Sequence, residues 1–166
     1  MRELELAGRE RQVADVWHNI AATYLRLGAH DKARAALSRA EEMQQETGHA
    51  RLGAWIKVTR AKIAIEEKRL GEAEKLLREA AVDASATSLA RGEALLVFAQ
   101  IQARRHAPAG KIREAFNAVL KETADEPIGT RVRALKLYAD ALKAAGDLEA
   151  AFEKSREALE LLRPGN

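Results

Sequence analysis

The sequence predicts an all-α protein, an α-solenoid built from about four antiparallel helix hairpins. Ala, Leu, Glu, Arg and Lys dominate the composition, and these side chains lose little conformational freedom in a helix. Apolar residues recur at helical spacing along most of the chain. Small residues also return at a fixed period of forty positions, which indicates a repeat architecture. A plain antiparallel bundle would explain the apolar stripes but not the period.

The period is visible as residue identities at one offset. Adding forty to four positions of the first hairpin reaches the same residue types in the second, since Ala21, Ala33, Leu37 and Ala40 become Ala61, Ala73, Leu77 and Ala80. The same offset relates the third hairpin to the fourth, because Ala94, Leu95, Phe98 and Ala99 become Ala134, Leu135, Tyr138 and Ala139. We expect these small residues to let paired helices approach closely.

In the first hairpin, one helix stripe carries four apolar residues, Trp17, Ile20, Ala21 and Tyr24. Gly28 follows, where a left-handed residue can end the helix. The stripe of a second helix comes next, at Ala33, Leu37 and Ala40. Extended along the chain, the pattern predicts helices over 9–27, 31–47, 50–68, 71–83, 88–105, 111–123, 128–145 and 148–162.

The turns between the predicted helices differ. Lys68 occupies the place of the turn Gly in the second hairpin, and the third turn is expected to be about four residues longer than the fourth. Asp147 is a natural N-cap, and Pro127 suits the first turn of its helix.

These residues resemble the tetratricopeptide repeat, whose pattern runs large, Leu, small, aromatic, Gly, Ala, aromatic or Leu, Ala, Pro. The first unit meets it through Trp17, Ile20, Ala21, Tyr24, Gly28, Ala33, Leu37 and Ala40. The last unit meets it through Leu135, Tyr138, Ala139, Leu142, Gly146, Ala151, Ala158 and, one place late, Pro164. The middle two units match the pattern at fewer positions, and they are assigned mainly from the forty-residue period. The resemblance implies a right-handed solenoid forming one domain over 1–166, with units at about 9–47, 50–83, 88–123 and 128–162.

The forty-residue spacing resembles the longer-helix variety of this repeat, common in bacterial regulators and signalling adaptors. The resemblance therefore implies a non-catalytic scaffold or adaptor that binds a protein or peptide in a concave groove, as a regulatory component of a larger protein or complex. The implied ligand contacts lie on the first helix of each hairpin: Asp15, His18, Asn19, Arg26, Trp55, Thr59, Lys62, Gln100, Arg104, Arg133, Lys136, Asp140 and Lys143. The same wall includes Ala22, Val58, Glu66, Glu93, Leu96, Val97 and Leu137.

Family members that clamp the C-terminal carboxylate of heat-shock chaperones use Lys, Asn and Arg at fixed places. The corresponding places here hold His18, Ala22, Thr59, Glu93 and Val97. None of them matches, so we expect no clamp of that kind.

No residue pattern suggests catalysis, a metal or a cofactor. The chain has no Cys, which removes thiolate sites and disulfides and fits a reducing compartment. No two His residues are spaced at i+3 or i+4, and His30, His49 and His106 fall in predicted turns, where we expect them to face solvent. The stretch "AGKIRE" lacks the spacing of a phosphate-binding loop.

The net charge of +3 comes from 28 basic and 25 acidic residues that alternate along the chain. This pattern favours a solvated mixed-charge surface over a nucleic-acid patch. The nucleic-acid alternative requires one basic face made of Arg104, Arg105, Lys111, Arg113, Arg131 and Arg133. No apolar run is long enough for a membrane span or a signal peptide, so we expect a cytoplasmic protein.

The ends of the predicted repeat array leave apolar residues uncovered. The segment "RELELA" reads as the tail of a preceding unit's second helix, and no polar helix follows Phe152, Leu159 and Leu162. We therefore expect either that the chain is part of a longer natural protein, or that its ends meet a partner or a second copy through the terminal helices.

Overall fold

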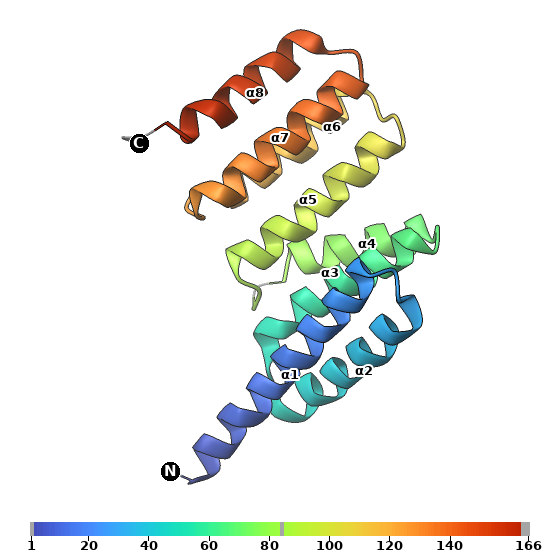
Figure 1. Cartoon of the computed structure of the whole chain (residues 1–166), viewed down its shortest axis with the longest axis vertical. Coiled ribbons are helices and arrows are strands. Elements are labelled where there is room, and N and C mark those ends of the chain that lie inside the picture. The colour runs from blue at the N-terminus through green and yellow to red at the C-terminus, as the bar shows by residue number, and fades with distance from the viewer. Residues whose placement is uncertain (1, 84, 164–166) are drawn as a thin grey trace. The chain divides into compact units, whose positions relative to one another are not determined.

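The structure is a computed structural model that describes residues 2–83 and 85–163, with side chains from residue 8 onward. This range contains eight α-helices and no strand, which confirms the all-α prediction (Figure 1). The helices are α1 Arg2–Arg26, α2 His30–Thr47, α3 Ala50–Glu66, α4 Leu70–Ala81, α5 Ser88–Arg104, α6 Ala109–Glu122, α7 Ile128–Ala144 and α8 Leu148–Leu161. Pro164, which the repeat pattern places after the last helix, lies outside the described residues.

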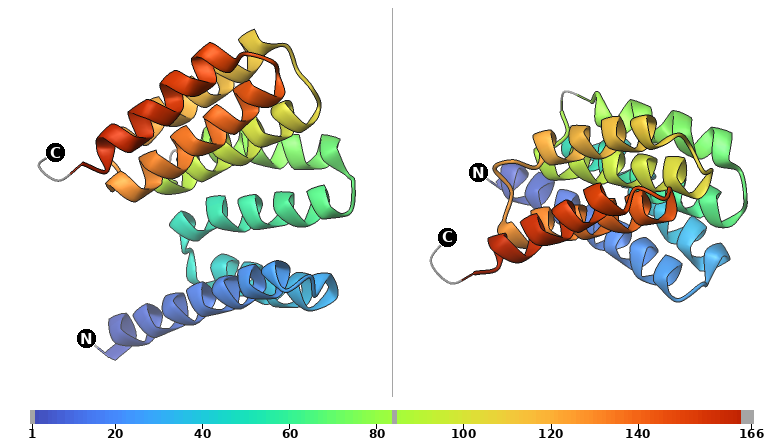
Figure 2. Two further views of the ribbon diagram at one scale, coloured as in Figure 1. Left: turned by 45° about the horizontal axis from the view of Figure 1, so that its top comes forward. Right: turned by 90° about the horizontal axis from the view of Figure 1, so that it is seen from above.

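The chain divides into two compact units, residues 1–90 and 91–166. In the first unit, α1 packs on α2 and α3 packs on α4 as antiparallel hairpins, and α3 also contacts both α1 and α2 (Figures 1 and 2). In the second unit, α7 and α8 form a hairpin, and α6 packs on α7. The helices therefore pair in the order that the forty-residue period predicts.

Small side chains lie where the helices of each unit approach closely. Ala21 and Ala61 have no exposed surface in the first unit. Ala99 and Ala139 are 0% and 6% exposed in the second. The core of the first unit adds larger residues around these alanines, among them the buried Leu37 and the partly buried Trp17. The prediction that these alanines are enclosed between helices is confirmed.

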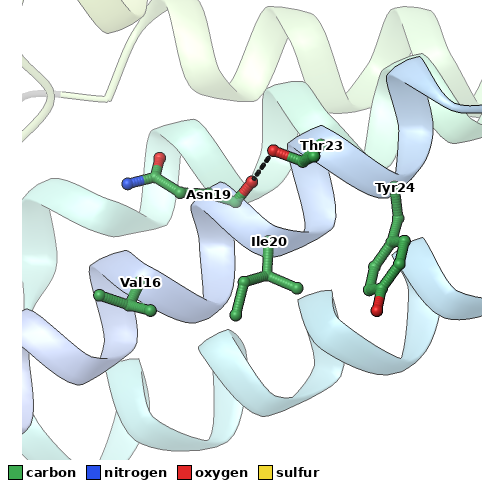
Figure 3. A pocket seen from close by; sticks show the side chains of 5 residues that line it. All are labelled: Val16, Asn19, Ile20, Thr23 and Tyr24. Atoms are coloured by element: carbon green, nitrogen blue, oxygen red, sulfur yellow. Dashed lines mark hydrogen bonds between the residues drawn. The ribbon is translucent and has the colours of Figure 1, made fainter.

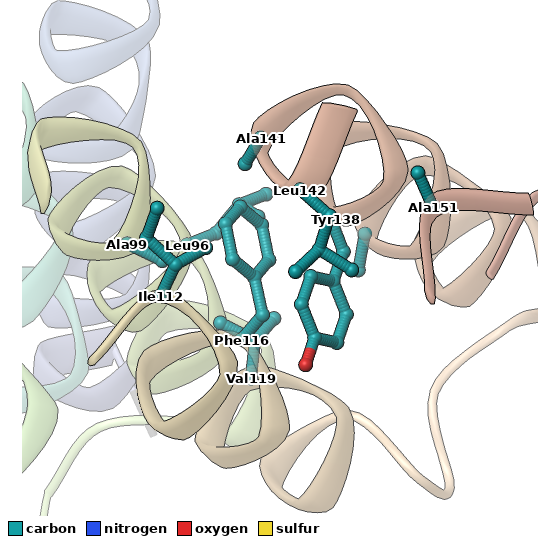
Figure 4. Close-up of a cluster of buried hydrophobic side chains, with 10 residues drawn as sticks. Leu96, Ala99, Ile112, Phe116, Val119, Tyr138, Ala141, Leu142 and Ala151 are labelled. Atoms are coloured by element: carbon teal, nitrogen blue, oxygen red, sulfur yellow. The ribbon is translucent and has the colours of Figure 1, made fainter. Parts of the chain in front are cut away.

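The core of the second unit centres on an aromatic pair (Figure 4). The rings of Phe116 and Tyr138 stack with centroids 4.8 Å apart and planes 5° from parallel. Leu96 and Ala99 reach this cluster from α5, and Leu142 reaches it from α7. The cluster therefore joins α5, α6 and α7, and the stacked rings contribute a large part of its buried apolar area.

A left-handed residue ends the first helix of each hairpin. Gly28 and Gly146 have φ values of 70° and 84°, as the turn pattern predicts. Lys68 and His106 take the same conformation without being glycine, with φ values of 62° and 53°. The repeat geometry therefore holds in the two degenerate units, at some conformational cost.

Two expectations about helix starts are wrong. Helix α1 begins at Arg2, so residues 2–7 continue it through Gly8 and do not form the tail of a separate helix. The segment is rich in Glu, Leu and Arg, and one exposed Gly costs a helix only about 1 kcal/mol. Helix α7 begins at Ile128, which makes Pro127 its N-cap residue and not part of its first turn.

The third turn is also shorter than expected. It spans residues 105–108, one residue more than the fourth turn at 145–147, because α6 already begins at Ala109. Pro108 is the N-cap of α6, where its fixed φ and missing N–H are tolerated. The N-cap prediction for Asp147 is confirmed, since its carboxylate accepts a hydrogen bond from the backbone N–H of Ala150.

Candidate functional site

In the first unit, ligand contacts expected on two different hairpins meet on one surface. A pocket of about 260 Å³ is lined from α1 by Asp15, His18 and Asn19, and from α3 by Leu52 and Trp55. Because α1 and α3 are the first helices of successive hairpins, positions forty residues apart lie side by side. We call this surface the α1–α3 pocket.

His18 is the central polar side chain of the α1–α3 pocket. Its Nε2 shares a 2.9 Å hydrogen bond with the Thr59 hydroxyl, and its ring lies 6.2 Å from that of Trp55. Burial lowers the pKa of His18 below 6.5, although the Asp15 carboxylate acts in the opposite direction. At neutral pH the pocket therefore presents an uncharged imidazole beside an indole ring.

One residue beside the pocket makes a contact that the sequence analysis missed. His49 Nε2 lies 3.1 Å from the Asp15 carboxylate, and the His49 side chain is only 18% exposed. The expectation that His49 faces solvent is therefore wrong, and His30 is likewise half-buried, whereas His106 is exposed. No local pattern could have found the contact, because His49 sits in a turn 34 residues from Asp15.

The remaining expected contacts of the first unit differ in accessibility. Asn19 and Arg26 are exposed, and Arg26 donates a 3.4 Å hydrogen bond to Thr23. Lys62 is half-buried. Thr59 is 4% exposed, so its side chain is not accessible to a ligand, and its hydroxyl instead holds the His18 ring by a hydrogen bond.

In the second unit, α5 and α7 bring together residues forty positions apart in the same way. The Arg133 guanidinium donates two hydrogen bonds to the Glu93 carboxylate, at 2.9 and 3.3 Å. Arg133 is therefore part of a bidentate ion pair that fixes the register of α5 against α7. The Arg133 guanidinium therefore already has a carboxylate partner in Glu93.

The other expected contacts of the second unit lie along α5 and α7. Lys136, Asp140 and Lys143 are exposed on α7, Arg104 is exposed at the end of α5, and Gln100 is half-buried. Three cations and one carboxylate make this α5–α7 surface basic. The expectation that apolar residues line the surface beside the ligand contacts is wrong in part. Val58 in the first unit, and Leu96 and Val97 in the second, are at most 4% exposed.

The six basic residues of the nucleic-acid alternative do not form one free basic face. Arg133 pairs with Glu93, and Arg113 pairs with Asp147. Arg104 is the last residue of α5, eleven residues after Glu93, which corresponds to about 16 Å along the helix. Nucleic-acid binding through this set therefore has little geometric support.

Among the side chains described at residues 8–83 and 85–163, no three His, Cys, Asp or Glu residues gather so that they could hold a metal ion. Of the described helices, none combines the length and the apolar character needed to cross a bilayer.

Residues 12–81 match the model of the tetratricopeptide repeat family. The matched segment runs from within α1 to the end of α4 and contains the whole α1–α3 pocket. A search of curated proteins finds no match to the chain. Proteins of the matched family generally mediate contacts between proteins.

Proposed function

We propose that the chain, of which residues 12–81 match the tetratricopeptide repeat family, is a non-catalytic scaffold that binds a peptide or protein segment on the first helices of its hairpins. The α1–α3 pocket is the observation that carries this proposal. It is a hollow of about 260 Å³ in which a neutral imidazole, an indole ring, an amide and a carboxylate converge. Rigid helices hold these groups in place, which lowers the entropic cost of binding.

The chemistry of the α1–α3 pocket favours an extended peptide. The amide of Asn19 both donates and accepts hydrogen bonds, as a peptide main chain requires. The half-buried indole ring of Trp55, which lines the pocket, suits an apolar or cationic side chain. Asp15, whose side chain is 51% exposed, adds a preference for a positively charged ligand group.

The basic α5–α7 surface suits a ligand of the opposite charge. Lys136, Lys143 and Arg104 are exposed there, and ammonium and guanidinium groups form strong hydrogen bonds with carboxylates. We propose that each unit contributes its own contacts, with basic or apolar ligand residues in the first and acidic ones in the second.

The proposal is tested by selecting peptides from a random library on the whole chain and measuring their affinity by fluorescence anisotropy. We expect Asn19→Ala and Trp55→Ala each to weaken the selected peptides about tenfold or more, because each removes one desolvated contact. Asn117→Ala is the matched control, since Asn117 is an exposed Asn on the second helix of a hairpin. It should change affinity less than about twofold.

Peptides whose affinity depends on Asn117 and not on Asn19 or Trp55 would contradict the proposal. Peptides from chaperone C-termini should not bind as a clamp requires, because Thr59 and Val97 are buried at two of the clamp positions.

We further propose a regulatory role within a larger cytoplasmic complex, supported by the forty-residue period and the absence of Cys. Co-purification with mass spectrometry tests that role.

A further inference from the structure

Helix α1 and the turn that follows it carry an apolar stripe that the other described helices of the unit leave largely exposed, with only Ile20 half-buried. We call Val13, Val16, Ile20, Thr23 and Leu27 the α1 end face. Val13, Val16 and Leu27 are 43%, 54% and 73% exposed. A hollow of about 400 Å³ follows this stripe, lined by Val16, Asn19, Ile20, Thr23 and Tyr24 (Figure 3). The hollow lies along one helix and differs from the α1–α3 pocket in all its lining residues except Asn19.

Helix α8 carries a second such stripe. We call Phe152, Ser155, Leu159 and Leu162 the α8 end face. Phe152, Leu159 and Leu162 are 70%, 63% and 55% exposed. The solvent side of a helix normally carries polar residues at these spacings, so three large apolar residues in register point to a contact surface.

The junction between the first two hairpins shows how such faces pair. Arg34 on α2 is ion-paired with Glu67, which follows α3, and Glu41 on α2 is ion-paired with Arg60 on α3. Farther along, the Gln44 side chain comes within 4.0 Å of where a Cβ on Gly53 would lie. The second helix of one hairpin thus meets the first helix of the next at three matched positions.

The repeat period identifies the residues of the two end faces that correspond to these three junction positions. An offset of 118 brings Ala33 onto Ala151 and Ala40 onto Ala158, and an offset of forty relates α1 to α3. The three junction pairs then correspond to Phe152 with Leu27, Leu159 with Ile20, and Leu162 with Val13. In each pair, both members are apolar, whereas the internal junction uses two ion pairs and a Gln beside a Gly.

The junction between α6 and α7 shows that an apolar version of this contact is compatible with the fold. Leu120 on α6 corresponds to Leu159, because an offset of 39 brings Ile112 onto Ala151. Leu120 packs against the cluster that contains Tyr138, and Tyr138 corresponds to Ile20. The two end faces therefore carry the kind of apolar residues that the α6–α7 junction uses. In the end faces, the two sides of such a junction would come from two different copies of the chain.

We propose that the α8 end face of one copy binds the α1 end face of a second copy, so that the stacking of hairpins continues from chain to chain. The contact is heterologous, since it joins two different surfaces, and it leaves one end face free at each end of an open assembly. One helix stripe on each side makes a small interface, so the assembly is expected to be weak and dependent on concentration. It does not involve the α1–α3 pocket.

Sedimentation equilibrium of the 166-residue chain tests the proposal directly. Between about 10 µM and 1 mM chain, we expect the weight-average mass to rise at least twofold, as for a complex held by a small interface. A chain that stays monomeric at the highest concentration overturns the proposal and assigns the end faces to another protein.

Complementary variants distinguish this assembly from symmetric pairing. Leu159→Glu and Val16→Glu should each be monomeric alone, because each chain then has only one working end face. A mixture of the two should form one-to-one heterodimers and nothing larger. If Val16→Glu alone remains dimeric, the contact joins two α8 end faces and the proposal is wrong.

Two controls separate association from folding. Val82→Glu changes a residue that is 81% exposed but lies on neither end face, so it should leave the association unchanged. Circular dichroism should show wild-type helicity for every variant. If Val16→Glu fails this check, Val13→Glu replaces it, because Val13 is also exposed on the α1 end face.

The register of the contact is tested by copying the internal ion pair. Leu159→Glu with Ile20→Arg in one chain reproduces Glu41 and Arg60 at corresponding positions. We expect this double variant to recover association that Leu159→Glu alone abolishes, and to lose it again at high salt. Failure of a folded double variant to associate contradicts the proposed register.

Discussion

His18 is a half-buried imidazole whose charged form is disfavoured by burial, and this couples the α1–α3 pocket to pH. Burial lowers its pKa in the folded chain below 6.5, the value near which it titrates when unfolded. The unfolded chain therefore binds more protons than the folded chain between those two pKa values. Stability rises with pH across that window and is lost as the pH falls through it.

Replacing His18 with Gln should weaken this pH dependence while keeping a hydrogen-bonding group near Thr59. Urea unfolding of the wild type at pH 7.5 and 5.5 should show a lower free energy of unfolding at pH 5.5. In His18→Gln that difference should be smaller. His106→Asn is the control, since His106 is exposed and Asn tolerates its left-handed backbone. An equal pH response in both variants would contradict the assignment.

Lys68 shows the cost of a missing turn glycine at the scale of one residue. Its φ of 62° is a conformation that L-residues with a side chain rarely adopt. Lys68→Gly should therefore raise the free energy of unfolding by about 1 kcal/mol. Lys75→Gly, at an exposed helical position of α4, should lower it by about 1 kcal/mol. Chemical denaturation of both variants checks the opposite signs.

At the scale of elements, each hairpin depends on small residues where two helices meet. Gly92 on α5 is an example, because a Cβ added there would lie 2.5 Å from Cγ2 of Thr123. Thr123 ends α6, is 2% exposed, and donates a hydrogen bond to the backbone carbonyl of Val119. That bond holds its methyl group against Gly92, so the glycine lets α5 approach the end of α6.

Gly92→Ala should therefore destabilise the protein by about 1–3 kcal/mol through overpacking. Thr123→Ser removes the obstructing methyl group and keeps the hydroxyl, so it should recover most of the loss in the double variant. A double-mutant cycle from thermal or urea unfolding measures this coupling. Additive effects of the two substitutions would show that the close approach is not the cause.

At the scale of the whole molecule, each of the two compact units has its own buried residues. Leu37 is 3% exposed in the core of the first unit, and Leu142 is fully buried in the core of the second. The segment at residues 82–87 joins α4 to α5, close to the boundary between the units. Repeat proteins often open in such contiguous blocks.

Leu37→Ala and Leu142→Ala should each cost about 2–5 kcal/mol, the range for a large-to-small core substitution. Native-state hydrogen exchange should locate the loss, with Leu37→Ala lowering protection mainly in α1–α3 and Leu142→Ala mainly in α6–α8. A uniform loss of protection in both variants would show that the chain opens as a single block.

The sequence alone predicted the number and order of the described helices, and all of their bounds to within two residues except the start of the first helix. It could do so because the forty-residue period, the enclosed alanines and the turn residues are local or strictly periodic features. Ala21 and Ala139 are buried, as their spacing predicted, because small residues at these positions lie where two helices approach closely. The exposed Phe152 and Leu159 could also be identified, because a helix stripe needs no knowledge of other helices.

Only the tertiary structure decided which polar side chains meet. His49 contacts Asp15 across 34 residues, Thr59 is buried beneath His18, and Arg133 is paired with Glu93. The sequence pattern specifies which face of a helix a residue occupies. How deeply the residue is covered, and by which partner, depends on the distances between helices, and these exist only once the hairpins have packed together.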